Sequence, residues 1–173
     1  MIEHELSVQF EAYFIMKLSA VLSDCRQYRY ELRRTWGTTK PTVLFIGLNP
    51  STADAQADDP TSRVCINYAK RWGYGAMVLG NLFAFRSTDS SVLRRIPDPV
   101  GPGNDASLKR LQSEASLVVC AWTDVGCLQE RDTAVLSFLR NPHCLKVLKS
   151  GRPGHPLYKR ADLRPIPLPG VRQ

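Results

Sequence analysis

The chain has 173 residues, a net charge of +7 and a hydrophobic fraction of 43%. A domain of this length buries about 70% of its unfolded surface, so stability requires neither a structural metal nor disulfides. No apolar run reaches the roughly 20 residues of a membrane span, and the stretch 12–22 lacks the basic leader of a signal peptide. We therefore expect a soluble, cytoplasmic protein without a membrane partner.

The first part of the chain predicts an extension followed by two strands. Residues 1–15 are expected to form a helical or loosely ordered N-terminal extension. Residues 26–36 alternate apolar or aromatic with charged side chains, which is the pattern of a half-exposed strand. The apolar run 43–46 is the pattern of a buried strand, and it opens into the glycine- and proline-containing loop GLNPSTAD.

A helix and a second buried strand follow this loop. Thr61 or Ser62 is expected to cap the helix, whose apolar face is formed by Val64, Tyr68 and Trp72. Gly73 and Gly75 are expected to end it. The next strand, 76–79, opens into a polar loop, and residues 89 or 90 to 96 are expected to form a short helix.

The remaining elements continue the alternation of helices and strands. We expect a helix from residue 104 or 105, a strand at 117–122, a helix at about 128–140 and a strand at 144–148. The proline-rich basic tail, 162–173, is expected to be extended or disordered.

This order predicts a single α/β domain over residues 16–161. Parallel neighbours need helical crossovers, which cover both faces of the sheet. We expect a three-layer sandwich around a mostly parallel, four-stranded sheet, with 26–36 as an antiparallel edge strand.

Polar residues follow each predicted parallel strand. In an open α/β sheet the carboxyl ends of the strands form the usual ligand site, so these exits predict one pocket. The candidate residues are Gly47, Asn49, Pro50, Ser51, Asn81, Arg86, His155 and Tyr158.

Each candidate also has a purely structural interpretation. Asn49 before Pro50 is typical of a turn, and Asn81 could tie its loop to the sheet. Asp58 and Asp59 are more typical of a helix cap than of a metal site, and we predict no metal or other cofactor.

The basic residues gather in two flanks of the sequence. Residues 25–40 hold five basic and one acidic side chain, and residues 146–173 hold seven basic and one acidic. Adjacent flanks would suit nucleic acid, and a solvated surface without a partner is the alternative. Candidate phosphate contacts are Arg63, Arg152, Lys159 and Arg160.

The five cysteines form no CxxC pair and lie mostly in apolar runs, which predicts reduced core thiols. The signature motifs of Walker-type nucleotide hydrolysis, Rossmann cofactor binding, zinc proteolysis and α/β-hydrolase chemistry do not occur.

A set of motifs resembles one bacterial and phage family from about residue 18 to residue 158. The motifs GLNPSTAD, DDPTSR, GYG, NLFAFRST, PVGPGND, AW and GHPLY are similar to those of domain of unknown function 1643. In that family glycine usually follows AW and the histidine motif continues as LYL, whereas Thr123 and Lys159 stand at those positions here.

A more distant resemblance is to the uracil-DNA glycosylase superfamily, especially its mismatch-specific branch. There a G-x-N-P loop, a strand-end asparagine and an HPS motif leave successive strands. The resemblance implies that Asn49 positions the attacking water, Asn81 reads the base and His155 stabilises the departing base anion. The fourth motif here is HPLY, so the element that wedges open a duplex in that superfamily has no evident counterpart.

Two functions follow as hypotheses. One is a glycosylase-like hydrolase that cleaves the N-glycosidic bond of a normal or modified base in DNA or a nucleotide. The other is a non-catalytic module that binds a nucleotide or nucleic acid in the same pocket.

Overall fold

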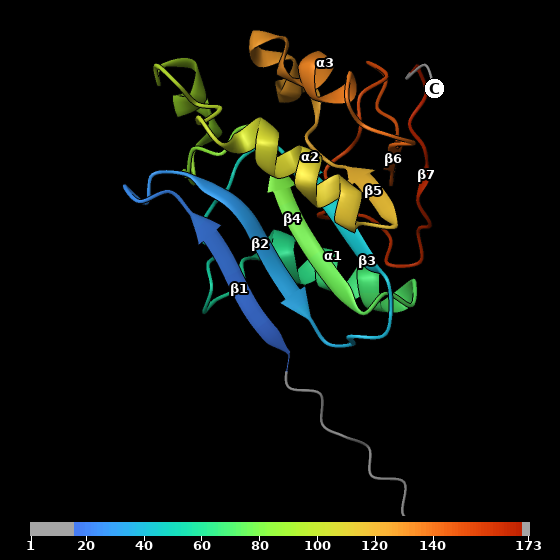
Figure 1. Cartoon of the computed structure of the whole chain (residues 1–173). Coiled ribbons are helices and arrows are strands. Elements are labelled where there is room, and N and C mark those ends of the chain that lie inside the picture. The colour runs from blue at the N-terminus through green and yellow to red at the C-terminus, as the bar shows by residue number, and fades with distance from the viewer. Residues whose placement is uncertain (1–15, 171–173) are drawn as a thin grey trace, which may run out of the picture.

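The computed structural model describes residues 16–170, so the expected extension 1–15 lies outside the described residues. One seven-stranded sheet crosses the molecule in the order β1-β2-β4-β3-β5-β6-β7 (Figure 1). The strands are β1 (Lys17–Leu22), β2 (Arg29–Thr35), β3 (Thr42–Gly47), β4 (Ala76–Asn81), β5 (Leu117–Cys120), β6 (His143–Cys144) and β7 (Ile166–Pro167).

The sheet is mixed rather than mostly parallel. Strand β3 pairs in parallel with β4 and β5, and β5 pairs in parallel with β6. Antiparallel pairs join β1 to β2, β2 to β4 and β6 to β7. The α/β class is therefore confirmed, but the sheet is larger than the expected five strands.

Strand β2 differs from its prediction in position and in burial. It lies between β1 and β4, so it is not the edge strand. Its charged residues Arg29, Glu31 and Arg34 are buried. Both arginines donate to backbone carbonyls of the loop 53–57, and Glu31 pairs with Arg33 and with Arg110 of the neighbouring helix. The alternating pattern therefore predicted a half-exposed edge strand where the structure has an interior strand with buried charges.

Helices cover both faces of the sheet. The helix α1 (Pro60–Arg71) lies behind it in Figure 1, and α2 (Asn104–Glu114) lies in front. Helix α3 (Arg131–Leu136) lies at the top of that view, and its Val135 belongs to the same core cluster as Leu108 of α2. Two 3-10 helices, η1 (Ser90–Arg94) and η2 (Asp124–Glu130), connect these elements. None of the helices formed by the described residues is both long and apolar enough to cross a bilayer.

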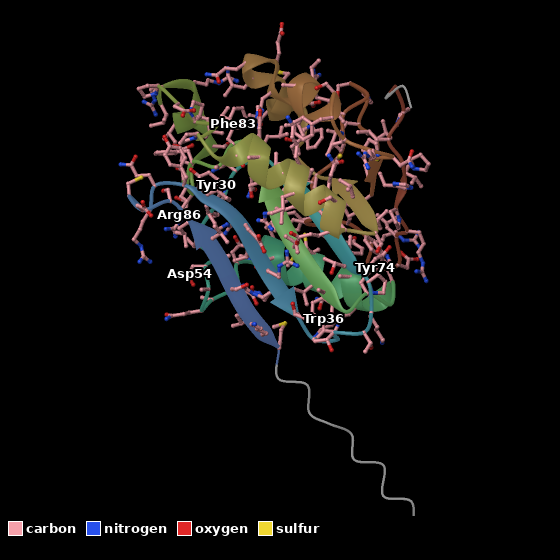
Figure 2. All side chains as sticks on the ribbon, viewed as in Figure 1. Tyr30, Trp36, Asp54, Tyr74, Phe83 and Arg86 are labelled. Atoms are coloured by element: carbon pink, nitrogen blue, oxygen red, sulfur yellow. The ribbon has the colours of Figure 1, made fainter. Side chains whose placement is uncertain are left out.

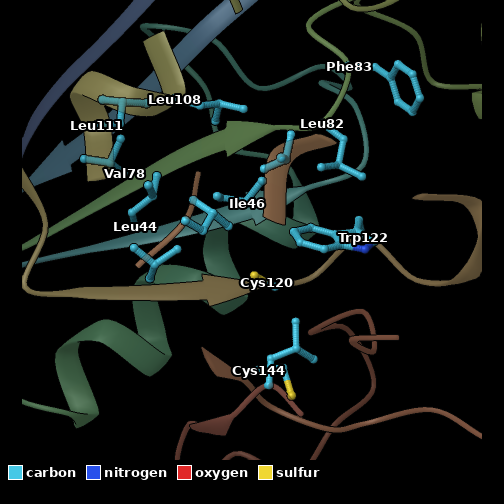
Figure 3. Packing of buried hydrophobic residues seen from close by; sticks show 14 of the residues in the cluster. Leu44, Ile46, Val78, Leu82, Phe83, Leu108, Leu111, Cys120, Trp122 and Cys144 are labelled. Atoms are coloured by element: carbon cyan, nitrogen blue, oxygen red, sulfur yellow. The ribbon is translucent and has the colours of Figure 1, made fainter. Parts of the chain in front are cut away.

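Alternating residues of β3 build the two cores. Val43 and Phe45 pack with α1, and Leu44 and Ile46 pack toward Leu108 of α2 on the other face. Figure 3 shows the second cluster, in which Trp122 lies beyond the end of β5. Strands β3 and β4 are buried on both faces, as their continuous apolar runs predict.

The later elements are shorter than predicted. The helix expected at 128–140 is α3, which begins only at Arg131, because Gln129 and Glu130 have left-handed φ angles of 55° and 53°. The strand expected at 144–148 is reduced to His143–Cys144. Within the expected tail, Ile166–Pro167 pairs with that short strand.

The cysteine prediction is only partly correct. Cys65, Cys120 and Cys144 are buried free thiols, and burial raises the pKa of each. Cys25 and Cys127 are free but exposed.

Candidate functional site

A polar pocket lies at the carboxyl ends of the parallel strands. Its volume is about 260 Å³, slightly below the ~300–1,000 Å³ range of small-molecule sites. Five of the sequence-predicted residues from three separate segments line it: Gly47, Asn49, Ser51, Asn81 and His155.

Two loops form one continuous wall of the pocket because their backbones are hydrogen-bonded to each other. The amides of Leu82 and Phe83 donate to the carbonyls of Gly47 and Leu48, each at 2.9 Å. These bonds extend the β3–β4 pairing beyond the strands, so the residues after both strands keep a fixed register.

The carboxamide of Asn49 is oriented by the loop that follows β4. Its Nδ2 donates to the carbonyl oxygen of Ser87 at 2.9 Å and to that of Pro50 at 3.2 Å. Among the described residues no hydrogen bond uses Oδ1. Asn49 therefore joins two loops, and its Oδ1 is an unused acceptor on a residue that lines the pocket.

Asn81 is the buried polar group at the base of the pocket. Its surface is 3% exposed, and its Nδ2 has no hydrogen-bond partner among the described residues. An added Cβ at Gly47 would lie 3.1 Å from Asn81 Oδ1, so glycine at 47 gives this carboxamide its space. An unsatisfied buried amide costs about 1–3 kcal/mol, which a ligand acceptor would recover.

His155 enters the pocket from the segment after β6. The backbone amide of Leu157 donates to Nδ1 at 3.2 Å, so the neutral ring carries its proton on Nε2. Burial, followed by the charge of Lys159, lowers the pKa of His155, and Asp59 opposes this shift. The ring is consequently neutral at pH 7 and offers Nε2–H as a donor.

Sequence reasoning missed Arg29 as a pocket residue and considered Asp59 only as a metal ligand or helix cap. Both line the pocket. Arg29 begins β2, and an antiparallel neighbour of β4 brings its first residue to the edge where β4 ends. An antiparallel strand beside the parallel sheet was predicted, and its pairing with β4 places Arg29 near the pocket. The alternating pattern, however, assigned its side chain to the solvent.

Asp59 has a structural role in addition to its position in the pocket. Its carboxylate accepts from the Ser62 amide at 2.7 Å and caps α1. Asp58 pairs with Arg34 at 2.8 Å. Both adjacent carboxylates are therefore engaged by the protein itself.

Three predicted residues lie outside the walls of this pocket. Pro50 is buried, and its carbonyl accepts from the Ser87 amide. Arg86 lines a neighbouring open hollow, which shares Ser51 with the pocket. Figure 2 shows Arg86 toward the end of the sheet away from Trp36 and Tyr74. Tyr158 is 100% exposed.

The predicted phosphate contacts do not gather around the pocket. Arg152 pairs with Asp132 at 2.7 Å, and Arg160 pairs with Asp162 at 2.6 Å. Arg63 donates to the Asp58 carbonyl, and Lys159 lines a separate hollow beside α1.

These features define a mixed α/β protein with a polar pocket at the carboxyl ends of its parallel strands. The chain belongs to the family described as protein of unknown function (DUF1643), whose model matches residues 29–157. The match covers every pocket segment, including β2 with Arg29 and the loop with His155. Comparison with curated proteins and with solved structures gives no significant match.

Proposed function

We propose that this protein is a glycosylase-like hydrolase that cleaves the N-glycosidic bond of a base in a nucleotide or in DNA. The observation that carries the proposal is the unpartnered, buried carboxamide of Asn81, in one pocket with a neutral His155. A carboxamide has a donor and an acceptor side by side, which suits the edge of a nucleobase. The distant resemblance to the uracil-DNA glycosylase superfamily assigns the same roles.

The chemistry divides among three side chains. Asn81 would hold the base, and the Nε2–H of His155 would donate to the base as negative charge develops on it. The Oδ1 of Asn49 would accept a hydrogen bond from the attacking water, since Nδ2 is already held by Ser87. A carboxamide is a poor base, so stabilisation of the leaving group would supply most of the rate.

The distribution of basic residues favours a nucleotide over a long duplex as substrate. Arg29 and Arg34 are buried, and Arg33 pairs with Glu31 and Glu114 at 2.6 Å. The first basic flank therefore presents few free charges to a polyanion.

The test is release of free base, followed by mass spectrometry. Substrates are nucleoside monophosphates and oligonucleotides with normal and modified bases. We expect Asn81→Ala and His155→Ala to lower kcat about 100-fold or more. Asn67→Ala, at an exposed site in the hollow beside α1, is the matched control and should keep full activity. Absence of base release across the whole panel would refute the hydrolase.

A non-catalytic nucleotide-binding module is the second candidate. The loop-joining hydrogen bonds of Asn49 favour it, because they explain this residue without a reaction. This function predicts saturable binding without turnover, weakened by Asn81→Ala and His155→Ala but not by Asn67→Ala.

A further inference from the structure

The pocket contains a buried arginine without a counter-ion in contact. Arg29 is 1% exposed, and Nη1 donates to the carbonyl oxygen of Ala53 at 2.6 Å. Its Nε has no partner, and no carboxylate of the described residues lies within 4.0 Å of its guanidinium. A guanidinium has five N–H donors, so most of its capacity is unused by the protein.

Arg34 on the same strand shows how this fold satisfies a structural arginine. It is 0% exposed, and its Nε pairs with Asp58 at 2.8 Å. Its other nitrogens donate to backbone carbonyls, including that of Asp54 at 2.6 Å. Burial of a charge without such partners is unfavourable. Arg34 therefore has the partners of a structural arginine, whereas Arg29 lacks a carboxylate partner among the described residues and is free to bind a ligand.

The surroundings of Arg29 leave it charged and favour an anion. Burial lowers the pKa of Arg29 to about 10, so the guanidinium remains protonated at pH 7. The nearest opposing charge is Asp59, whose carboxylate is held by the cap of α1. Two further unused donors, Nδ2 of Asn81 and Nε1 of Trp122, belong to residues that line the same pocket.

We propose that Arg29 forms an oxyanion-binding site, and that the natural ligand of this pocket carries a phosphate or carboxylate group. The inference concerns the same pocket as the proposed function and narrows its substrate to an anionic one, such as a nucleotide. It requires no reaction there, so binding and base release are separate measurements.

The test measures thermal stability and calorimetric binding of the full chain at constant ionic strength, with chloride as the background anion. The probes are inorganic phosphate, acetate, nucleoside 5′-monophosphates and the parent nucleosides. We expect phosphate or acetate to raise the Tm of the wild type, and a monophosphate to bind more tightly than its nucleoside. A response to phosphate assigns a phosphate ligand, and a response to acetate alone assigns a carboxylate.

Variants of two arginines locate the site. Arg29→Gln should weaken binding of the anion about 10- to 150-fold, the loss of a charge-assisted hydrogen bond. Because this variant removes an uncompensated buried charge, its ligand-free Tm should equal or exceed that of the wild type. Arg86→Gln removes a neighbouring charge that lies in a different hollow, and it should weaken the anion response less than Arg29→Gln does. Arg29→Lys, which keeps the charge but loses the planar fork of donors, provides a second test of weakened binding if Arg29→Gln does not fold.

Three results would overturn the proposal. The first is a wild type whose Tm rises with none of the anions. The second is an Arg29→Gln variant that binds the anion as tightly as the wild type and has a lower ligand-free Tm. The third is loss of anion binding in Arg86→Gln alone. Anion binding without base release would refute the hydrolase alone, and base release unaffected by Arg29→Gln would refute the anion site alone.

Discussion

Thr123 adopts a backbone conformation that normally requires glycine. Its φ and ψ are 65° and −169°, a region that side chains with a Cβ avoid. Its amide donates to the Pro153 carbonyl at 3.0 Å, which joins the exit of β5 to the segment that contains His155. Glycine would adopt this geometry without strain, so Thr123 places strain beside the pocket.

We therefore expect Thr123→Gly to stabilise the protein. Relief of about 1–3 kcal/mol of strain is offset by about 0.5–1 kcal/mol of glycine backbone entropy, which leaves a net gain of about 1 kcal/mol. Urea denaturation should show a higher midpoint with an unchanged slope. Thr123→Ser keeps the Cβ and should show no comparable gain. A Thr123→Gly variant less stable than the wild type would contradict the assigned strain.

Site residues were predictable where they directly follow a buried apolar run. Asn49 and Asn81 leave β3 and β4, so position alone indicated the pocket edge. Arg29 was not predictable from its local pattern, because alternation assigns charged residues to the solvent face. Its guanidinium is held by the carbonyl of Ala53, in a loop that is distant in sequence.

At the scale of elements, the start of α1 is set by Asp59 rather than by Thr61 or Ser62. Pro60 is the first helical residue, and the side chains of Asp59 and Ser62 bond each other's backbone amides at 2.7 Å and 3.0 Å. The sequence did indicate this helix, and Gly73, with a φ of 88°, follows its end as expected.

Loss of this cap should destabilise the protein by a measurable amount. Asp59→Ala removes the side-chain acceptor and should lower the free energy of unfolding by about 1 kcal/mol. Asp59→Asn keeps an acceptor of similar capping strength and should retain most of the stability. Chemical denaturation measures the free energy of unfolding of both variants. An equal loss of stability in Asp59→Ala and Asp59→Asn would assign the effect to the carboxylate charge and not to the helix cap.

Other elements lacked a usable signal in the sequence. Strand β1 has only exposed and half-buried residues, so its sequence does not alternate clearly between apolar and polar side chains. The shortened α3 follows two non-glycine residues with positive φ, Gln129 and Glu130. No glycine or proline marks that break, and tertiary packing decides it.

At the scale of the whole molecule, several of the basic side chains behind the charge of +7 are bonded to carboxylates within the fold. Arg33 and Glu31 of β2 form an ion-pair network with Arg110 and Glu114 of α2. Arg152, in the second flank, is also paired with a carboxylate. Sequence sums count such residues as free charges, whereas the fold uses them to join α2 to β2 and to hold the later loops.

Duplex DNA should therefore bind weakly and with a shallow salt dependence. Each phosphate contact contributes a slope of about −0.9 to log K against log salt concentration. Because Arg29, Arg33 and Arg34 of the first flank and Arg152 and Arg160 of the second are buried or paired, we expect a slope shallower than about −4, equivalent to about four contacts or fewer. Fluorescence anisotropy with a labelled duplex between 50 and 200 mM salt, on the order of physiological ionic strength, measures it. A slope steeper than about −5 would indicate a polyanion-binding surface and would favour DNA over a nucleotide as substrate.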